Sequence, residues 1–234
     1  MEHMVSTKAI YVRMIFCGSA LIGLLFAGGT MARNDDYKDP LTFLDQTLKR
    51  MREVELSNRE NPRYFEAVKN FYTAYKNLGI LYQENDQPEN AIKAYTSALA
   101  YTPDYFSPRY AASVKVSLGK LLDKSGMTDE AFKMLQEARP FAEHPATVDN
   151  LLGVAAGKQG NGTAAEFYFK RAIKEDSRYA PAHYNLGIVF LKSRERQQGI
   201  DELRVAAGLN SGYADALARY ETASSPDTQH QSVR

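Results

Sequence analysis

Histidines and acidic side chains are the residues of this sequence that could perform acid–base or metal chemistry. The four histidines are His3, His144, His183 and His230. None stands in the His-Glu-x-x-His spacing that places two zinc ligands on one helix face, and the sequence contains no P-loop and no nucleophile elbow. Carboxylate pairs such as Glu53 and Glu55 are typical of a solvated helix face. We therefore expect no catalytic residue, no metal site and no cofactor.

Charge and cysteine content exclude further classes. The chain has 234 residues and a net charge of +1. Lys8 and Arg13 against Glu2 account for that excess, because the chain after residue 32 holds 27 basic and 27 acidic side chains. A nucleic-acid-binding protein usually carries a basic excess, so we expect no nucleic-acid partner. The single cysteine, Cys17, cannot form an intramolecular disulfide.

An apolar, uncharged segment, Met14 to Gly29, follows the basic residues Lys8 and Arg13. This order is typical of a secretory signal peptide. The segment also reaches the lower length limit of a membrane-spanning helix, so residues 1–32 are either a signal peptide or an uncleaved anchor; a buried helix is the third alternative. Both leading interpretations keep the basic flank in the cytoplasm and place the rest of the chain on the extracytoplasmic side. An uncleaved segment would give membrane contact through residues 14–29.

A Leu-Gly pair recurs along the rest of the chain, at intervals of 40, 34 and 34 residues. The pairs are Leu78-Gly79, Leu118-Gly119, Leu152-Gly153 and Leu186-Gly187. Recurrence at a fixed period of this length indicates a repeat architecture, in which each unit is too small to bury its apolar face alone. Four copies of one structural unit are therefore expected.

Other positions recur in the same register. Twelve or thirteen residues after the Leu-Gly pair comes a small residue, then a large apolar residue four further on, then alanine after three more: Ala91, Tyr95 and Ala98; Ala131, Leu135 and Ala138; Ala165, Phe169 and Ala172; Gly199, Leu203 and Ala206. Spacings of three and four mark one helix face, so each unit holds two helices. Small residues at fixed points let the two backbones approach closely. The sequence predicts an all-α, helical-hairpin repeat solenoid.

The pattern resembles the tetratricopeptide repeat (TPR) family. The residues that carry the resemblance in the first unit are Tyr75, Leu78, Gly79, Tyr82, Ala91, Tyr95, Ala98 and Pro103. Four units are expected between residues 72 and 213, at 72–105, 112–145, 146–179 and 180–213. The family's terminal proline survives only as Pro103, and six extra residues separate the first two units.

Flanking segments complete the predicted domain. Residues 33–71 are expected to hold a packing helix, with a stripe from Leu41 to Val54, and the start of an extended first repeat helix from about Pro62 to Glu84. Ser107-Pro108 predicts that the next helix runs from Pro108 to Lys124. Asp86 is expected as an N-cap. Residues 214–234 are expected to form a capping helix and a disordered tail.

The resemblance implies where a partner protein or peptide would bind. In the family the first helix of each repeat lines a concave groove, which assigns it here to Lys76, Ile80, Val116, Lys120, Asn150, Val154, Tyr184, Ile188 and Leu191. Lys76 matches one position of the clamp with which some members hold acidic chaperone tails, but the other four positions do not match. The apolar members form a candidate binding stripe; the alternative is that several are buried between neighbouring first helices.

The sequence thus favours a non-enzymatic scaffold on the extracytoplasmic side of a membrane. It would hold partner proteins during assembly of an envelope or secretion complex. Two other functions remain open: a permanent structural subunit of a membrane complex, and an accessory protein that presents substrates to an enzyme.

Overall fold

The computed structural model describes residues 63–100 and 108–222, which are helical apart from short turns and contain no strand. The all-α prediction is therefore confirmed for this part of the chain. The chain divides into two compact units, Met1–Ser125 (unit 1) and Gly126–Arg234 (unit 2), and each is described by itself.

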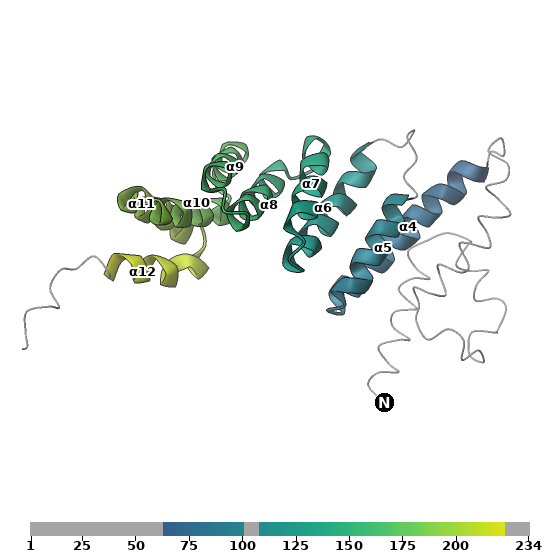
Figure 1. Ribbon diagram of the computed structural model, residues 1–234, viewed down its shortest axis with the longest axis horizontal. Helices are drawn as coiled ribbons and strands as arrows, with labels where there is room; N and C mark the ends of the chain where they lie inside the picture. The colour runs from purple at the N-terminus through teal and green to yellow at the C-terminus, as the bar shows by residue number, and fades with distance from the viewer. Residues whose placement is uncertain (1–62, 101–107, 223–234) are drawn as a thin grey trace, which may run out of the picture. The chain divides into compact units, whose positions relative to one another are not determined.

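Unit 1 contains three described helices: α4 (Arg63–Glu84), α5 (Pro88–Ala100) and α6 (Pro108–Lys124) (Figure 1). Helix α5 packs against both α4 and α6. The long α4 and the proline start of α6 have the bounds that the sequence predicted. A proline in the first turn costs no hydrogen bond, since the amide groups of that turn have no partner within the helix.

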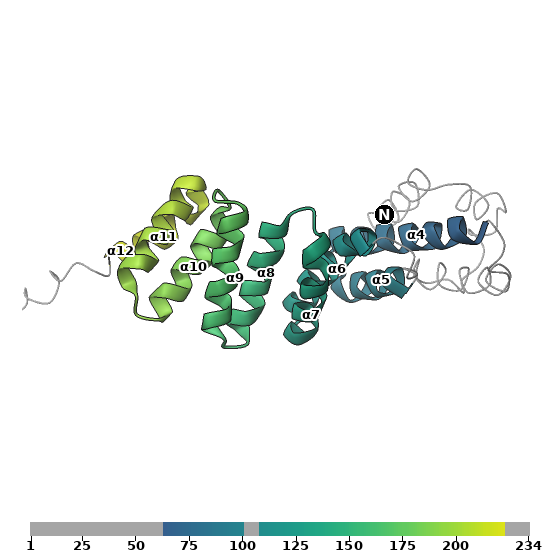
Figure 2. The ribbon, with the colours of Figure 1, turned by 90° about the horizontal axis from the view of Figure 1, so that it is seen from above.

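Unit 2 continues with successive short hairpins. Its elements are α7 (Thr128–Ala138), η1 (Arg139–Phe141), α8 (Pro145–Lys158), α9 (Gly162–Glu175), α10 (Ala180–Lys192), α11 (Arg196–Leu209), η2 (Ser211–Tyr213) and α12 (Ala214–Thr222). Each of α8, α9 and α10 packs against the next helix along the chain, as Figure 2 shows. Helix α12 lies against α11 at the position expected for the capping helix.

Several predictions fall outside the described residues: the apolar segment Met14 to Gly29, the packing helix from Leu41 to Val54, and the tail from Ser224 to Arg234. They stay predictions. Within residues 63–100 and 108–222, no helix combines the length and the apolar character needed to cross a membrane.

The turn between the two helices of each hairpin uses one left-handed residue at an equivalent position. Gly126 and Gly160 have φ values of 84° and 78°, and Asp86 and Arg194 have 54° and 67°. The prediction that Asp86 caps α5 is wrong, because α5 begins at Pro88 and Asp86 forms the turn itself. Aspartate tolerates this conformation better than most residues. Arginine carries a Cβ atom, so Arg194 adopts a positive φ at a steric cost that glycine does not have.

Close helix contacts explain the recurring small residues. A Cβ atom added at Gly79 would lie 2.5 Å from Cδ1 of Tyr95, and one added at Gly153 would lie 2.5 Å from Cε1 of Phe169. The alanines of the second helices are fully buried: Ala98, Ala138, Ala172 and Ala206. The hairpins α4–α5 and α8–α9 are thus each closed by a large side chain of the second helix lying on a glycine of the first.

A buried ionic cluster joins the elements of unit 2. The Asp149 side chain on α8 is fully buried and accepts hydrogen bonds from Nε and Nη2 of Arg139, at 3.2 and 3.0 Å, and from Nη2 of Arg171. Arg139 also donates to Glu175 Oε1 at 2.5 Å. The hydrogen bond from Arg139 to Asp149 is the main reason that the pKa of this guanidinium is raised. One carboxylate therefore holds η1, α8 and α9 together.

His183 is a further buried polar residue of unit 2, beside Asp149 and Asn150. Its Nδ1 lies 2.6 Å from Glu202 Oε2, and its Nε2 lies 3.0 Å from the carbonyl oxygen of Ser177. Both ring nitrogens thus have a partner, which fixes the ring between α10 and α11. The histidine serves packing and hydrogen bonding at this position, which the family usually fills with an aromatic ring.

Candidate partner-binding surfaces

We call the side of each repeat's first helix that is predicted to line the groove the A face. Helices α4 and α6 carry the A face of unit 1, and α8 and α10 carry that of unit 2. The structure gives the burial of every predicted residue of these faces and the contacts of four: Asn150, Val154, Tyr184 and Leu191.

Two asparagines meet on the A face of unit 2. Nδ2 of Asn185 on α10 donates to Oδ1 of Asn150 on α8 at 2.9 Å. The remaining polar atoms, Nδ2 of Asn150 and Oδ1 of Asn185, have no hydrogen-bond partner within the described chain, and neither is enclosed. The pair therefore offers one donor and one acceptor, which is the complement of a single peptide group. The sequence analysis named Asn150 and missed Asn185.

An aromatic stack flanks this pair. The rings of Tyr184 and Tyr213 are stacked, with centroids 4.8 Å apart and planes inclined by 25°. Tyr184 remains half-buried, and Tyr213 comes from η2, so the end of the chain's last hairpin supports the predicted binding residue. Burial is the main reason that the pKa of Tyr213 is raised. Two rings fixed in this way can offer a rigid apolar surface to a ligand.

The apolar residues of the unit 2 A face differ in what they touch. Val154 and Ile188 are half-buried, and Val154 packs against the core around Phe169 and Leu186. Leu191 lies directly over the backbone of α11, because a Cβ atom added at Gly199 would be only 2.7 Å from its Cγ. Leu191 thus contributes to the contact between α10 and α11.

The A face of unit 1 has different chemistry. Ile80 is exposed at 41%, Lys120 is exposed, and Lys76 and Val116 are half-buried. Two further cations continue the same helix faces: Lys69 lies seven residues before Lys76, and Arg109 seven before Val116. Within the described part of the chain none of Lys69, Lys76, Arg109 and Lys120 forms an ion pair. This face can attract acidic groups.

Across the described residues, no group of three or more histidine, cysteine, aspartate or glutamate side chains could hold a metal ion. What the faces offer is amide hydrogen bonding and aromatic contact in unit 2, and free positive charge in unit 1. These are the means by which a helical-repeat surface recognises another polypeptide.

This architecture defines a class of helical-hairpin repeat protein, and comparisons with known proteins show which family part of the chain resembles. Residues 70–144 match the family model described as tetratricopeptide repeat, which confirms the predicted resemblance. Tetratricopeptide repeats are in general non-enzymatic modules that bind protein or peptide partners. No curated protein matches the sequence.

Solved structures extend the likeness over most of the chain. MamA is 21% identical, with a TM-score of 0.53, and the alignment covers 65% of this chain and 88% of MamA. YrrB, described as a TPR protein with an unusual peptide-binding site, is 19% identical, with a TM-score of 0.56 and coverage of 77% and 90%. PilF of Pseudomonas aeruginosa is 17% identical, with a TM-score of 0.53 and coverage of 79% and 89%. At these identities the likeness establishes the fold alone.

Proposed function

We propose that the protein is a non-enzymatic scaffold that binds an extended segment of a partner protein on its A faces. The observation that carries the proposal is the Asn150–Asn185 pair. It presents a free donor and a free acceptor, Tyr184 is the residue before Asn185 on α10, and the predicted groove positions of α8 and α10 hold no charged residue. Amide groups at a fixed distance can bind the backbone of a peptide whatever its sequence, and the aromatic ring then selects an apolar side chain.

The resemblance to YrrB supports the same function. That protein is described as having a peptide-binding site, and its likeness covers 77% of the present chain. The identity of 19% carries over no individual residue, so the binding residues proposed for this chain come from its own geometry.

We further propose that the scaffold works on the extracytoplasmic side of a membrane, in the assembly of an envelope or secretion complex. The order of Lys8, Arg13 and the apolar segment Met14 to Gly29 supports this location. A reporter enzyme that is active only outside the cytoplasm, fused after Arg234, should be active. Activity solely from a reporter that requires the cytoplasm would refute the location while leaving the binding function intact.

The binding function is tested by a pair of alanine substitutions on α10. Tyr184→Ala removes a ring from the A face, and we expect it to weaken partner capture by about thirtyfold, while loss of the stack with Tyr213 lowers stability by only about 1 kcal/mol. Leu191→Ala is the matched variant, because Leu191 packs on Gly199 of α11. It should lower stability, by about 2–5 kcal/mol if the site cannot collapse. Capture that survives Tyr184→Ala unchanged contradicts the proposal.

A further inference from the structure

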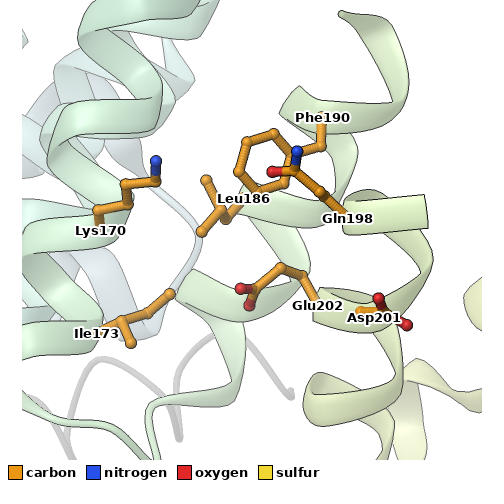
Figure 3. A pocket seen from close by; sticks show the side chains of 7 residues that line it. All are labelled: Lys170, Ile173, Leu186, Phe190, Gln198, Asp201 and Glu202. Carbon is orange, nitrogen blue, oxygen red and sulfur yellow. The ribbon is translucent and has the colours of Figure 1, made fainter. Parts of the chain in front are cut away.

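A cleft opens on the other side of unit 2, between α9 and α11 (Figure 3). Its volume is about 370 Å³. Leu186 and Phe190 of α10 form its apolar floor, with Ile173 of α9 beside them. Gln198, Asp201 and Glu202 of α11 line one wall, and Lys170 of α9 lies on the opposite wall. The cleft thus combines an apolar floor with two carboxylates from α11, of which Figure 3 shows that of Glu202 turned toward Leu186 and that of Asp201 turned away from it.

The charges around the cleft leave its acidic wall with free acceptors. Lys170 donates to Glu166 Oε1 at 2.6 Å, and its ammonium lies 5.4 Å from the centroid of the Phe190 ring. Asp201 accepts through Oδ1 from Gln197 and Arg204, and Glu202 contacts His183 through Oε2. Oδ2 of Asp201 and Oε1 of Glu202 have no partner among the described residues. Arg204 is shared with Glu221, so the wall stays net acidic.

The preceding repeat has no acidic wall at the equivalent positions. Thirty-four residues before Gln198, Asp201 and Glu202 stand Ala164, Phe167 and Tyr168. There the chain places its own arginine, Arg171, with the guanidinium 4.9 Å from the centroid of Tyr168 and hydrogen-bonded to the carboxylate of Asp149. The equivalent of Arg171 on α11 is Val205, which is uncharged. The cleft therefore lacks an equivalent of Arg171, and the arginine next to its wall, Arg204, is shared between Asp201 and Glu221.

We propose that this cleft binds one arginine side chain of a partner protein. The methylene groups of the arginine would lie on Leu186 and Phe190, and its guanidinium would donate to the free oxygens of Asp201 and Glu202. Arginine suits the site better than lysine, because its planar fork reaches two carboxylate oxygens at once and its stem packs on apolar surface. This second contact lies on different helix surfaces from the A faces and does not depend on them.

The test is a titration of the isotopically labelled full chain with Nα-acetyl-L-arginine methylamide, in which binding is monitored by the NMR shifts of the backbone amides. We expect saturable shifts in α9, α10 and α11 with half-saturation in the low millimolar range, as befits one side chain in an open cleft. The citrulline analogue has the same shape without the charge, and its affinity should be lower by at least about fivefold. The lysine analogue should also be weaker than the arginine probe.

Substitutions of the two carboxylates test whether they bind the arginine probe. Asp201→Asn should weaken binding of the arginine probe by about two- to fivefold, because one charged acceptor is lost at an exposed site. Asp215→Asn is the matched control: it makes the same change at an exposed position of α12 and should leave the titration unchanged. Glu202→Gln should also weaken binding, with a melting curve recorded beside it because Glu202 contacts His183.

Three results would overturn the proposal: shifts that do not saturate, equal binding of the citrulline or lysine analogue, and an undiminished response of Asp201→Asn. Tyr184→Ala, which changes the A face, should leave this titration unaltered. A failure of the arginine site is therefore distinguishable from a failure of the proposed peptide binding.

Discussion

Tyr75 is fully buried in α4 of unit 1, and the equivalent positions of unit 2 hold Asp149 in α8 and His183 in α10. The side chain of Tyr75 is uncharged, so its burial requires no counter-ion. The carboxylate needs two arginines, and the imidazole needs Glu202 and a backbone carbonyl group. Burial of a charged group is tolerated only where such partners exist.

The A faces show the reverse distribution. The A face of unit 1 carries Lys69, Lys76, Arg109 and Lys120 without ion pairs, whereas α8 and α10 of unit 2 present no charged residue at the predicted groove positions. Unit 1 thus carries four cations along its A face over the buried ring of Tyr75, and unit 2 buries Asp149 while its predicted groove positions hold no charged residue. The small residues at close helix contacts thus specify the hairpin, whereas the polarity and charge of the side chains at other positions can differ from repeat to repeat.

The largest expected effect concerns the buried cluster of unit 2. Asp149→Ala leaves Arg139 and Arg171 without their shared carboxylate, and should cost about 3–5 kcal/mol of stability, since one partner of a buried ion pair is removed. Urea unfolding of the full chain measures the loss. Asp215→Asn on α12 is the exposed control and should leave the midpoint in place. Equal midpoints for the wild type and Asp149→Ala would mean that the cluster does not hold unit 2 together.

The second effect tests the feature that the units share. Gly153→Ala introduces a Cβ atom 2.5 Å from Cε1 of Phe169, and should destabilise unit 2 by about 1–3 kcal/mol through overpacking. Gly157 lies one turn further along α8, where an added Cβ atom would have an ordinary contact of 3.8 Å with Ala165. Gly157→Ala should be neutral or stabilise by up to about 1 kcal/mol, because alanine favours the helix. Thermal melting of the two variants should give opposite signs.

The smallest effect addresses the charged face of unit 1. A hexaglutamate peptide should bind the full chain weakly. Its affinity should fall as salt rises from about 50 to about 200 mM, because the Debye length shortens and the charges are screened. Replacing Lys76 and Lys120 by serine should reduce the affinity by about two- to fivefold. Tyr184→Ala in unit 2 serves as the control and should leave it unchanged. Binding that is insensitive to salt would remove the electrostatic distinction between the two A faces.

Much of the fold could be predicted because it depends on local chemistry that the sequence displays. The glycines of the Leu-Gly pairs and the alanines of the second helices report backbone contacts within one hairpin, and Pro108 reports a helix start. Asp86 was misassigned because aspartate suits both an N-cap and a left-handed turn residue. Asp86 stands at the same repeat position as Gly126 and Gly160, and this correspondence indicates a left-handed turn residue.

The candidate sites were less predictable, because they depend on pairs of residues far apart in the sequence. Asn150 was named from its position in the family pattern, but its partner Asn185 lies 35 residues further on and shows no motif. Gly199 gave no sign that Leu191 would pack on it. The wall of Asp201 and Glu202 could have been found by comparing the last two repeats position by position, since aromatic residues stand there one repeat earlier.

The central claim is that a partner segment lies on the A face of unit 2, and site-specific photocrosslinking of the full chain in cells tests it most directly. A photoreactive residue would replace Ile188 of the A face or, as the control, the exposed Gln136 on the second helix α7. The account predicts a partner peptide crosslinked at position 188, identified by mass spectrometry and lost in Tyr184→Ala, with none at position 136. Crosslinks that form at position 136 and not at position 188 would contradict it.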